Sequence, residues 1–177
     1  GIPRGLETEE ILPLAVVFFQ ELGFTVKVLE NYGLKSLTEG AKLCQATFCS
    51  PVQILAGEAE RLKEENFIFL PKITEIPGKK EEKRCWVCPL SQATPDLFSP
   101  KLPPKVLQPF LDLKGGYERN QKEFIRLGSK LGYSRGKTLA AFKKAVKAQK
   151  KFEKQCRQIG KIALAYAIEK EIPVVVV

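Results

Sequence analysis

Histidine and methionine are both absent from the 177 residues of this chain. Histidine is the usual general base at neutral pH and the usual nitrogen ligand of zinc. A Ser–His–Asp or Cys–His mechanism within this chain is therefore excluded. A zinc site would have to be built from ligands other than histidine.

Long apolar runs and a secretory leader are missing as well. The longest apolar run, "LPLAVVFF", is followed by Gln20 and Glu21, and it is much shorter than a membrane span of about 20 residues. The chain opens "GIPRGLETEE", with early acids and no apolar signal region. We therefore expect a soluble cytoplasmic protein with no membrane partner. Thiols stay reduced in that compartment, so the five cysteines do not predict a disulfide framework.

A phosphate-binding loop of the Walker A type is also absent, so the chain is not expected to hydrolyse ATP itself. No two carboxylates form an obvious catalytic pair. Asp96 and Asp112 are expected near strand ends, where single carboxylates commonly act as caps. The sequence predicts no catalytic residue and leaves open whether the chain is an enzyme.

The net charge of +9 is concentrated in one segment. Lys and Arg dominate residues 119–161, where the acids are Glu123 and Glu153. Most of these cations lie in a long helix predicted from the N-cap Ser134 to Glu171. Without interleaved aromatic residues or a known DNA-binding module, the pattern favours a solvated face over nucleic-acid binding. Docking of an acidic partner or of CoA phosphates is a third interpretation.

Helical and strand patterns alternate along most of the chain. Helices are predicted at residues 6–23, 36–44, 51–66, 117–132 and 134–171, and strands at residues 24–30, 67–71, 106–113 and 172–177. The first helix is expected to have Thr8 as its N-cap and Gly23 as its C-cap. Residues 72–84 are expected to form a charged loop, and residues 89–105, broken by prolines, at most one or two helical turns.

This order predicts an α/β fold of the three-layer Rossmann-like or flavodoxin-like type, with a mostly parallel sheet of about four or five strands. We expect residues 1–118 to form the Rossmann-like domain that carries the cysteine pairs. Residues 119–171 would be a basic helical segment that packs on this domain or leaves it. The strand at residues 172–177 would begin a second domain.

Four of the five cysteines form two pairs, Cys44 with Cys49 and Cys85 with Cys88. Both pairs are expected in loops that converge at one edge of the sheet. Pro51 and Pro89 predict that a helix begins just after Cys49 and after Cys88, where free N–H groups and the helix dipole favour a thiolate.

Four thiolates could hold an iron–sulfur cluster. A structural zinc site is an alternative, although its usual form has two C-x2-C pairs, and buried cysteines that act as small hydrophobic residues are another. A thioredoxin-type redox pair is disfavoured because a charged loop separates the strand from Cys85. Cys156 differs, because it lies on an apolar stripe of the long helix between Phe142 and Tyr166, which predicts a core position.

Three stretches in order, "GIPRGLETEEILPLAVVFFQELGFTVKVLE", "CSPVQILAGEAERLKEENFIFLPKI" and "CPLSQATPDL", resemble the 2-hydroxyacyl-CoA dehydratase superfamily. More narrowly, they are similar to the N-terminal domain of its activase-related proteins, the CoA-substrate-specific enzyme activases. The resemblance implies Rossmann-like domains that hold an oxygen-sensitive 4Fe–4S cluster or a related larger cluster. It also implies low-potential electron transfer in an anaerobic setting, driven by an ATP-dependent activator and used to dehydrate an acyl-CoA.

Carried over from this resemblance, Cys49 and Cys88 match the two motif cysteines, and we favour them as cluster ligands. Cys44 and Cys85 match no family position and are weaker candidates. A further ligand would come from a second domain or a homologous subunit, and a homodimer is one such arrangement. Where relatives carry histidines after the first motif, this chain has Ala56 and Glu58. The alternative function is a non-enzymatic binding domain with a structural zinc or no metal.

Overall fold

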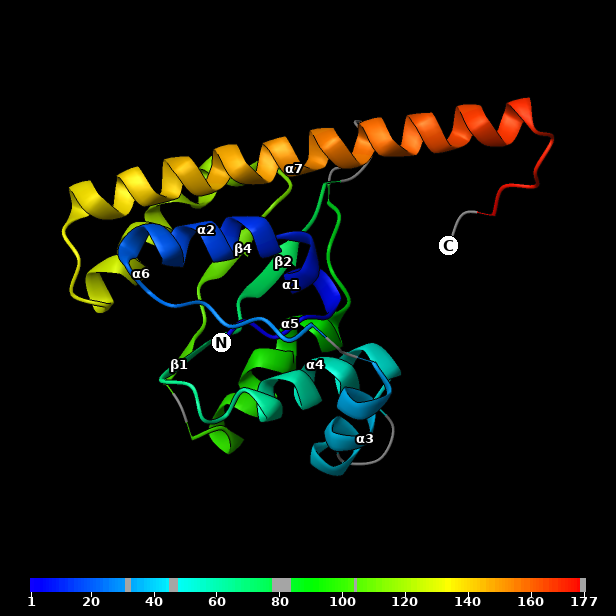
Figure 1. Cartoon of the computed structure of the whole chain (residues 1–177). Coiled ribbons are helices and arrows are strands. Elements are labelled where there is room, and N and C mark those ends of the chain that lie inside the picture. The colour runs from blue at the N-terminus through cyan, green and yellow to red at the C-terminus, as the bar shows by residue number, and fades with distance from the viewer. Residues whose placement is uncertain (31–32, 45–47, 78–83, 104, 176–177) are drawn as a thin grey trace.

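The computed structural model describes residues 1–30, 33–44, 48–77, 84–103 and 105–175. Four strands and nine helical segments lie within these residues (Figure 1). In chain order they are α1 (Leu6–Glu10), α2 (Leu12–Leu22), α3 (Leu34–Leu43), α4 (Ser50–Arg61), β1 (Phe67–Phe69), β2 (Lys72–Glu75), α5 (Pro89–Phe98), η1 (Ser99–Lys101), β3 (Lys105–Leu107), β4 (Phe110–Asp112), η2 (Tyr117–Asn120), α6 (Gln121–Lys130) and α7 (Arg135–Glu169).

The first predicted helix exists but is divided in two at Ile11. Gly23 ends α2 in the left-handed conformation, which confirms the predicted C-cap. The prediction for Thr8 was wrong. Thr8 is buried inside α1, and Gly5 is the N-cap instead, with a φ of 138° that a residue without a Cβ adopts easily.

The strands pair in parallel, β1 with β3 and β2 with β4. Both pairs begin in the same register, as Phe67↔Lys105 and Lys72↔Phe110 show, and the second pair shifts by one residue between Ile73 and Glu75. Between them, the N–H of Leu70 donates to the carbonyl of Leu107 and that of Lys72 to the carbonyl of Pro109, both at 2.9 Å. The two pairs are therefore one ribbon, interrupted where Pro71 and Pro109 have no N–H to give.

The predicted sheet of four or five strands is replaced, among the described residues, by these two pairs. Residues 24–30 form no strand. The nitrogen of Gly1 donates to the carbonyl of Phe67 at 2.6 Å, and the N–H of Ile2 donates to the carbonyl of Lys27 at 2.9 Å. Residues 1–2 thus lie between β1 and residue 27, but these contacts are too few to make a ladder. The parallel character of the pairing is confirmed.

Three other segments differ from the sequence prediction. Residues 72–75 form β2 rather than a loop, because β4 offers them a partner. Residues 89–98 form the full helix α5, since Pro89 occupies its first position and only Pro95 interrupts its hydrogen bonds. Residues 172–175 form no strand and are exposed beyond the end of α7.

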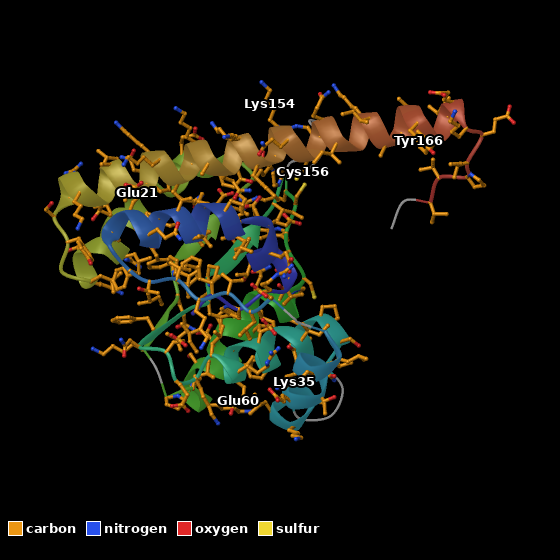
Figure 2. All side chains as sticks on the ribbon, viewed as in Figure 1. Glu21, Lys35, Glu60, Lys154, Cys156 and Tyr166 are labelled. Atoms are coloured by element: carbon orange, nitrogen blue, oxygen red, sulfur yellow. The ribbon has the colours of Figure 1, made fainter. Side chains whose placement is uncertain are left out.

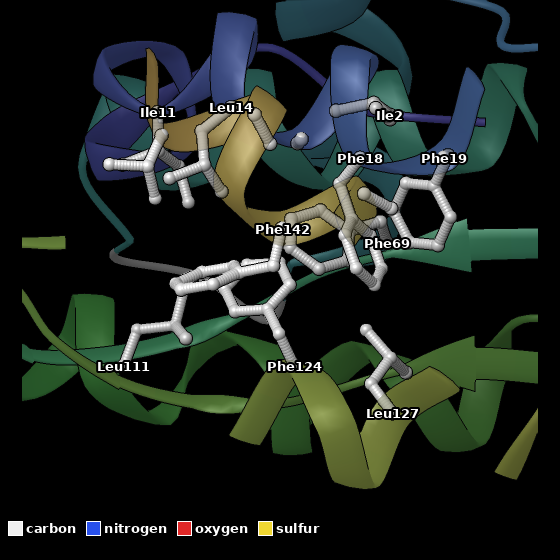
Figure 3. Close-up of a cluster of buried hydrophobic side chains, with 14 of the residues drawn as sticks. Ile2, Ile11, Leu14, Phe18, Phe19, Phe69, Leu111, Phe124, Leu127 and Phe142 are labelled. Carbon is white, nitrogen blue, oxygen red and sulfur yellow. The ribbon is translucent and has the colours of Figure 1, made fainter. Parts of the chain in front are cut away.

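The main core lies between α2, α6, the strands and the first half of α7, up to Gln149, which we call its proximal half (Figure 3). Phe124 of α6 stands between Phe18 of α2 and Phe142 of α7, with ring centroids 4.8 Å away in both cases. All three rings are fully buried. Apolar burial and edge contacts between aromatic rings therefore fix the base of the long helix to the body.

Helix α7 is the predicted long helix, and the Ser134 side chain caps it by accepting from the N–H of Lys137 at 3.3 Å. Its 35 residues span about 50 Å. The buried residues end at Gln149, and the distal half runs past the body to the C-terminal end (Figure 1). The core position predicted for Cys156 was wrong, because Cys156 is exposed. Periodicity identifies an apolar face, but not whether another element covers it.

Candidate functional site

Cys49 and Cys88 each lie at the N-cap of a helix, as predicted. The Cys49 carbonyl accepts from the N–H groups of Val52 and Gln53 at 3.1 Å, and the Cys88 carbonyl accepts from the N–H of Gln92 at 3.0 Å. Both cysteines are exposed. The backbone thus places two accessible thiols beside the positive ends of α4 and α5.

The two cysteine loops are held in the same way by a glutamine. The side-chain amide of Gln53 donates to the carbonyl of Phe48 at 2.8 Å, and that of Gln92 donates to the carbonyl of Val87 at 2.7 Å. In each case the glutamine lies four residues after the cysteine and binds the residue before it. We call this contact the glutamine brace. The repeated spacing C-x3-Q, in "CSPVQ" and "CPLSQ", could have revealed it in the sequence.

The starts of α4 and α5 border a shared apolar cluster around Phe98. Phe48, just before Cys49, packs against Phe98 edge to face at 6.3 Å between ring centroids, and Leu90, two residues after Cys88, packs on the same cluster. The hydroxyl of Ser91 donates to the Glu7 carboxylate and so ties α5 to α1. The sequence elements that carry the two thiols therefore meet in one region of the fold.

Cys44 has the surroundings of a buried hydrophobic residue. It ends α3, is 8% exposed and packs in the cluster that contains Val52, Ala56 and Phe98. Burial raises the pKa of the Cys44 thiol, and the nearby Lys101 ammonium opposes this effect without cancelling it. The neutral thiol is favoured, which is the form that packs well rather than the form that binds a metal.

Cys85 and Cys88 belong to different local structures although they are three residues apart. The Cys85 carbonyl accepts from the N–H of Ile76 at 3.1 Å, next to an antiparallel bridge between Glu75 and Trp86. Cys85 is half-buried in this extended segment, whereas Cys88 begins a helix. The C-x2-C motif is therefore not a single knuckle that presents both thiols from one turn.

Glu58 lies where the resemblance would place histidine, and its surroundings are structural. Its side chain is fully buried; one oxygen accepts from the Ser36 hydroxyl and from Arg61 Nη1, the latter at 3.0 Å. The other oxygen has no hydrogen-bond partner among the described residues. This network joins α3 to α4. The same two helices also contribute residues to the apolar cluster around Cys44.

A cavity of about 720 Å³ lies away from the cysteines. Its lining includes Gly1, Phe24 and Phe67, from the start of the chain, the segment after α2 and the start of β1. None of the five cysteines contributes to this lining. We therefore do not assign it to the thiol chemistry.

In the part of the chain that the structure describes, no three Cys, Asp or Glu side chains gather as a metal-binding group. A complete four-cysteine site is thus not assembled from Cys44, Cys49, Cys85 and Cys88 there. The donor chemistry of Cys49 and Cys88 fits two positions of a cluster, and the remaining ligands would have to come from elsewhere. Among the same residues, no helix is long and apolar enough to cross a membrane.

Comparison with known proteins adds one finding. The family described as "CoA enzyme activase uncharacterised domain" matches residues 1–177, the whole of this chain. No curated protein and no solved structure matches it.

Proposed function

The chain belongs to the CoA enzyme activase domain family, and from this membership we propose that it is the cysteine-bearing module of an electron-transfer system that serves an acyl-CoA dehydratase. In this proposal Cys49 and Cys88 are ligands of a 4Fe–4S cluster or a related larger cluster. The observation that carries the proposal is the pair of exposed N-cap thiols, each held by the same glutamine brace.

The starts of α4 and α5 suit a negatively charged ligand. The helix dipole there would stabilise an anionic cluster bound to the two cysteines. The glutamine brace keeps each loop in the conformation that presents its thiol outward. When bound, the cluster supplies one-electron transfer at low potential.

Two thiols leave a cluster incomplete, so we propose that a second body completes the ligand set. That body is a further domain, a homologous subunit or a second copy of this chain. An ATP-dependent activator would be a separate partner, because residues 1–177 contain no Walker A motif. Cys44 and Cys85 remain weaker ligand candidates, because Cys44 is buried and Cys85 lies in a segment that pairs with the end of β2.

The first prediction concerns metal content. Purified under strict anaerobiosis, the protein should contain iron and acid-labile sulfide, and Cys49→Ser and Cys88→Ser should each lose both. Cys156→Ser is the matched control, because Cys156 is also exposed but lies on the distal half of α7.

Other outcomes would overturn the cluster or change its ligand set. A colourless wild-type protein that contains zinc or no metal would overturn the cluster and favour a non-enzymatic binding domain. Retention of the cluster in Cys49→Ser or Cys88→Ser would remove that cysteine from the ligand set. Loss in Cys44→Ser or Cys85→Ser would add it.

A further inference from the structure

Trp86 is the single tryptophan of the chain, and it is exposed close to a candidate ligand of the iron–sulfur cluster. Its side chain is 58% exposed, and among the described residues it belongs to none of the buried apolar clusters. Cys88, two residues further along the chain, is exposed as well. A large aromatic side chain stabilises a fold mainly when other groups cover it, so core packing does not explain Trp86.

The backbone holds Trp86 in a fixed position. An antiparallel bridge joins Trp86 to Glu75 at the end of β2. Beside this bridge, the N–H of Val87 donates to the carbonyl of Thr74 at 3.0 Å. The place of Trp86 in the fold is therefore set by its pairing with β2, which belongs to the central ribbon of strands.

Alternation along this segment places the Trp86 and Cys88 side chains on the same side. Val87, which lies between them, points into the main core and is 5% exposed. Cys88 has a ψ of 131°, so the chain is still extended there, and α5 begins only at Pro89. Because successive side chains of an extended chain point to opposite faces, Trp86 and Cys88 both face outward, about 7 Å apart along the backbone.

Arg84 restrains the indole of Trp86. Its guanidinium carbon lies 5.0 Å from the centroid of the Trp86 ring, and its Nη1 donates to Glu75 Oε1 at 3.2 Å. A cation over an aromatic ring is attracted to the ring face, and the ion pair with Glu75 keeps that cation in place. The indole therefore has a preferred position on the outward side of the segment.

Building on the proposed function, we propose that Trp86 shields from water one side of the cluster that Cys88 binds. A cluster attached to Cys88 Sγ lies on the outward side of the segment, which is where the indole stands. Trp86 is a shielding residue and not a ligand, because its only polar group is an N–H donor. The apolar shell around a metal site controls solvent access, and solvent exposure is one of the factors that set the potential of an iron–sulfur cluster.

The direction of the effect follows from charge. Reduction adds negative charge to the cluster, and water stabilises that charge better than an indole does. Apolar cover from Trp86 therefore lowers the reduction potential, which suits electron transfer at low potential. The same cover slows the access of dissolved oxygen from this side.

Tryptophan fluorescence tests the contact, because all indole emission of the chain comes from Trp86. In protein purified under strict anaerobiosis, most of this emission should be quenched, and it should recover after the iron is removed by chelation and dialysis. Emission that stays the same when a bound cluster is removed would overturn the shielding and leave the proposed function intact. A wild-type protein without iron and sulfide would overturn both.

A second measurement needs no cluster. With the other four cysteines replaced by Ala, a nitroxide label on Cys88 should quench Trp86, because a nitroxide quenches an indole only at close range. The matched control carries the label on Cys156 alone, on the distal half of α7, and its emission should be unchanged. Equal emission from the two labelled proteins would contradict the placement of Trp86 beside Cys88.

Substitutions at Trp86 test the shielding itself. Trp86→Ala should shift the midpoint potential of the cluster upward and make the cluster bleach faster in air, whereas Trp86→Phe, which keeps an aromatic ring, should stay closer to wild type. Tyr166→Ala is the matched control, because Tyr166 is also 58% exposed but lies on the distal half of α7, beyond the body (Figure 2). Unchanged potential and bleaching in Trp86→Ala, with a wild-type circular dichroism spectrum, would overturn the proposal.

Discussion

Tyr117 shows how a single residue fixes the long helix to the body. Its hydroxyl donates to the carboxylate of Glu153, at the point where α7 leaves the core. Burial and this hydrogen bond raise the pKa of Tyr117 well above its ordinary value of 10.0. Nearby, the buried Gln149 side chain accepts from the N–H of Leu14 at 3.1 Å and donates to the carbonyl of Glu10 at 2.8 Å. These contacts satisfy polar groups at the junction of α1 and α2.

The Tyr117 environment predicts the pH dependence of stability at alkaline pH. The pKa of Tyr117 is higher in the folded state than in the unfolded state. Its contribution to the free energy of unfolding is therefore complete below pH 10.0 and is lost as the pH rises above that value. The difference in tyrosinate absorbance between wild type and Tyr117→Phe should show no ionisation of Tyr117 near its ordinary pKa while the protein stays folded. A full tyrosinate signal from Tyr117 at that pH, in a folded protein, would contradict the buried hydrogen bond.

Residue identity predicted some features well and others poorly. Pro51 and Pro89 located the helix starts that place Cys49 and Cys88, because proline is favoured in the first turn. The C-x2-C spacing alone made Cys85 a ligand candidate. In the structure, the segment around Cys85 pairs with the end of β2, so Cys85 and Cys88 have different surroundings. The repeated C-x3-Q spacing marks the glutamine brace in the sequence, and the structure shows which carbonyl each amide binds.

At the scale of elements, α3 and α4 pack with their backbones in direct contact. A Cβ added at Gly40 would stand 1.7 Å from the carbonyl oxygen of Gln53, and one at Gly57 would stand 1.8 Å from that of Ser36. Both neighbours are backbone atoms, which cannot turn aside as a flexible side chain can. These two glycines therefore set the distance between the helices.

Gly40→Ala should destabilise the protein by forcing α3 away from α4, at a cost of about 1–3 kcal/mol for overpacking. Gly136→Ala is the matched control in α7, where nothing lies within 4 Å of the new Cβ. It should be neutral or stabilise by about 0.5–1 kcal/mol through helix propensity. Urea unfolding followed by circular dichroism measures both changes. Equal effects of the two substitutions would show that α3 and α4 do not touch as described.

The strands illustrate why element prediction succeeded only in part. Residues 24–30 have strand-like alternation but meet residues 1–2 through too few hydrogen bonds, whereas residues 72–75 lack an obvious pattern and become β2 beside β4. A strand is a property of two segments together. A helix such as α7 satisfies its own backbone, so its sequence could predict it almost to the residue.

At the scale of the whole molecule, α7 has two halves with different surroundings. The proximal half is held by α2 and α6, and the distal half contacts little of the described chain. Amide hydrogen exchange should therefore be slow in the proximal half at every protein concentration. In the distal half it should be faster, because few contacts with the rest of the described chain protect its backbone. Uniform protection along α7 would contradict the division of the helix into a packed half and an exposed half.

The sequence by itself determined the family, the long basic helix, the parallel pairing and the placement of Cys49 and Cys88 at helix starts. These features depend on proline positions, helical period, motif sequence and the alternation of helix and strand patterns along the chain. Only the tertiary structure decided that Cys44 is buried, that Cys156 is exposed and that the apolar face of α7 continues beyond its cover. The physical reason is that burial depends on which other elements arrive at a face, and no periodicity within the face itself contains that information.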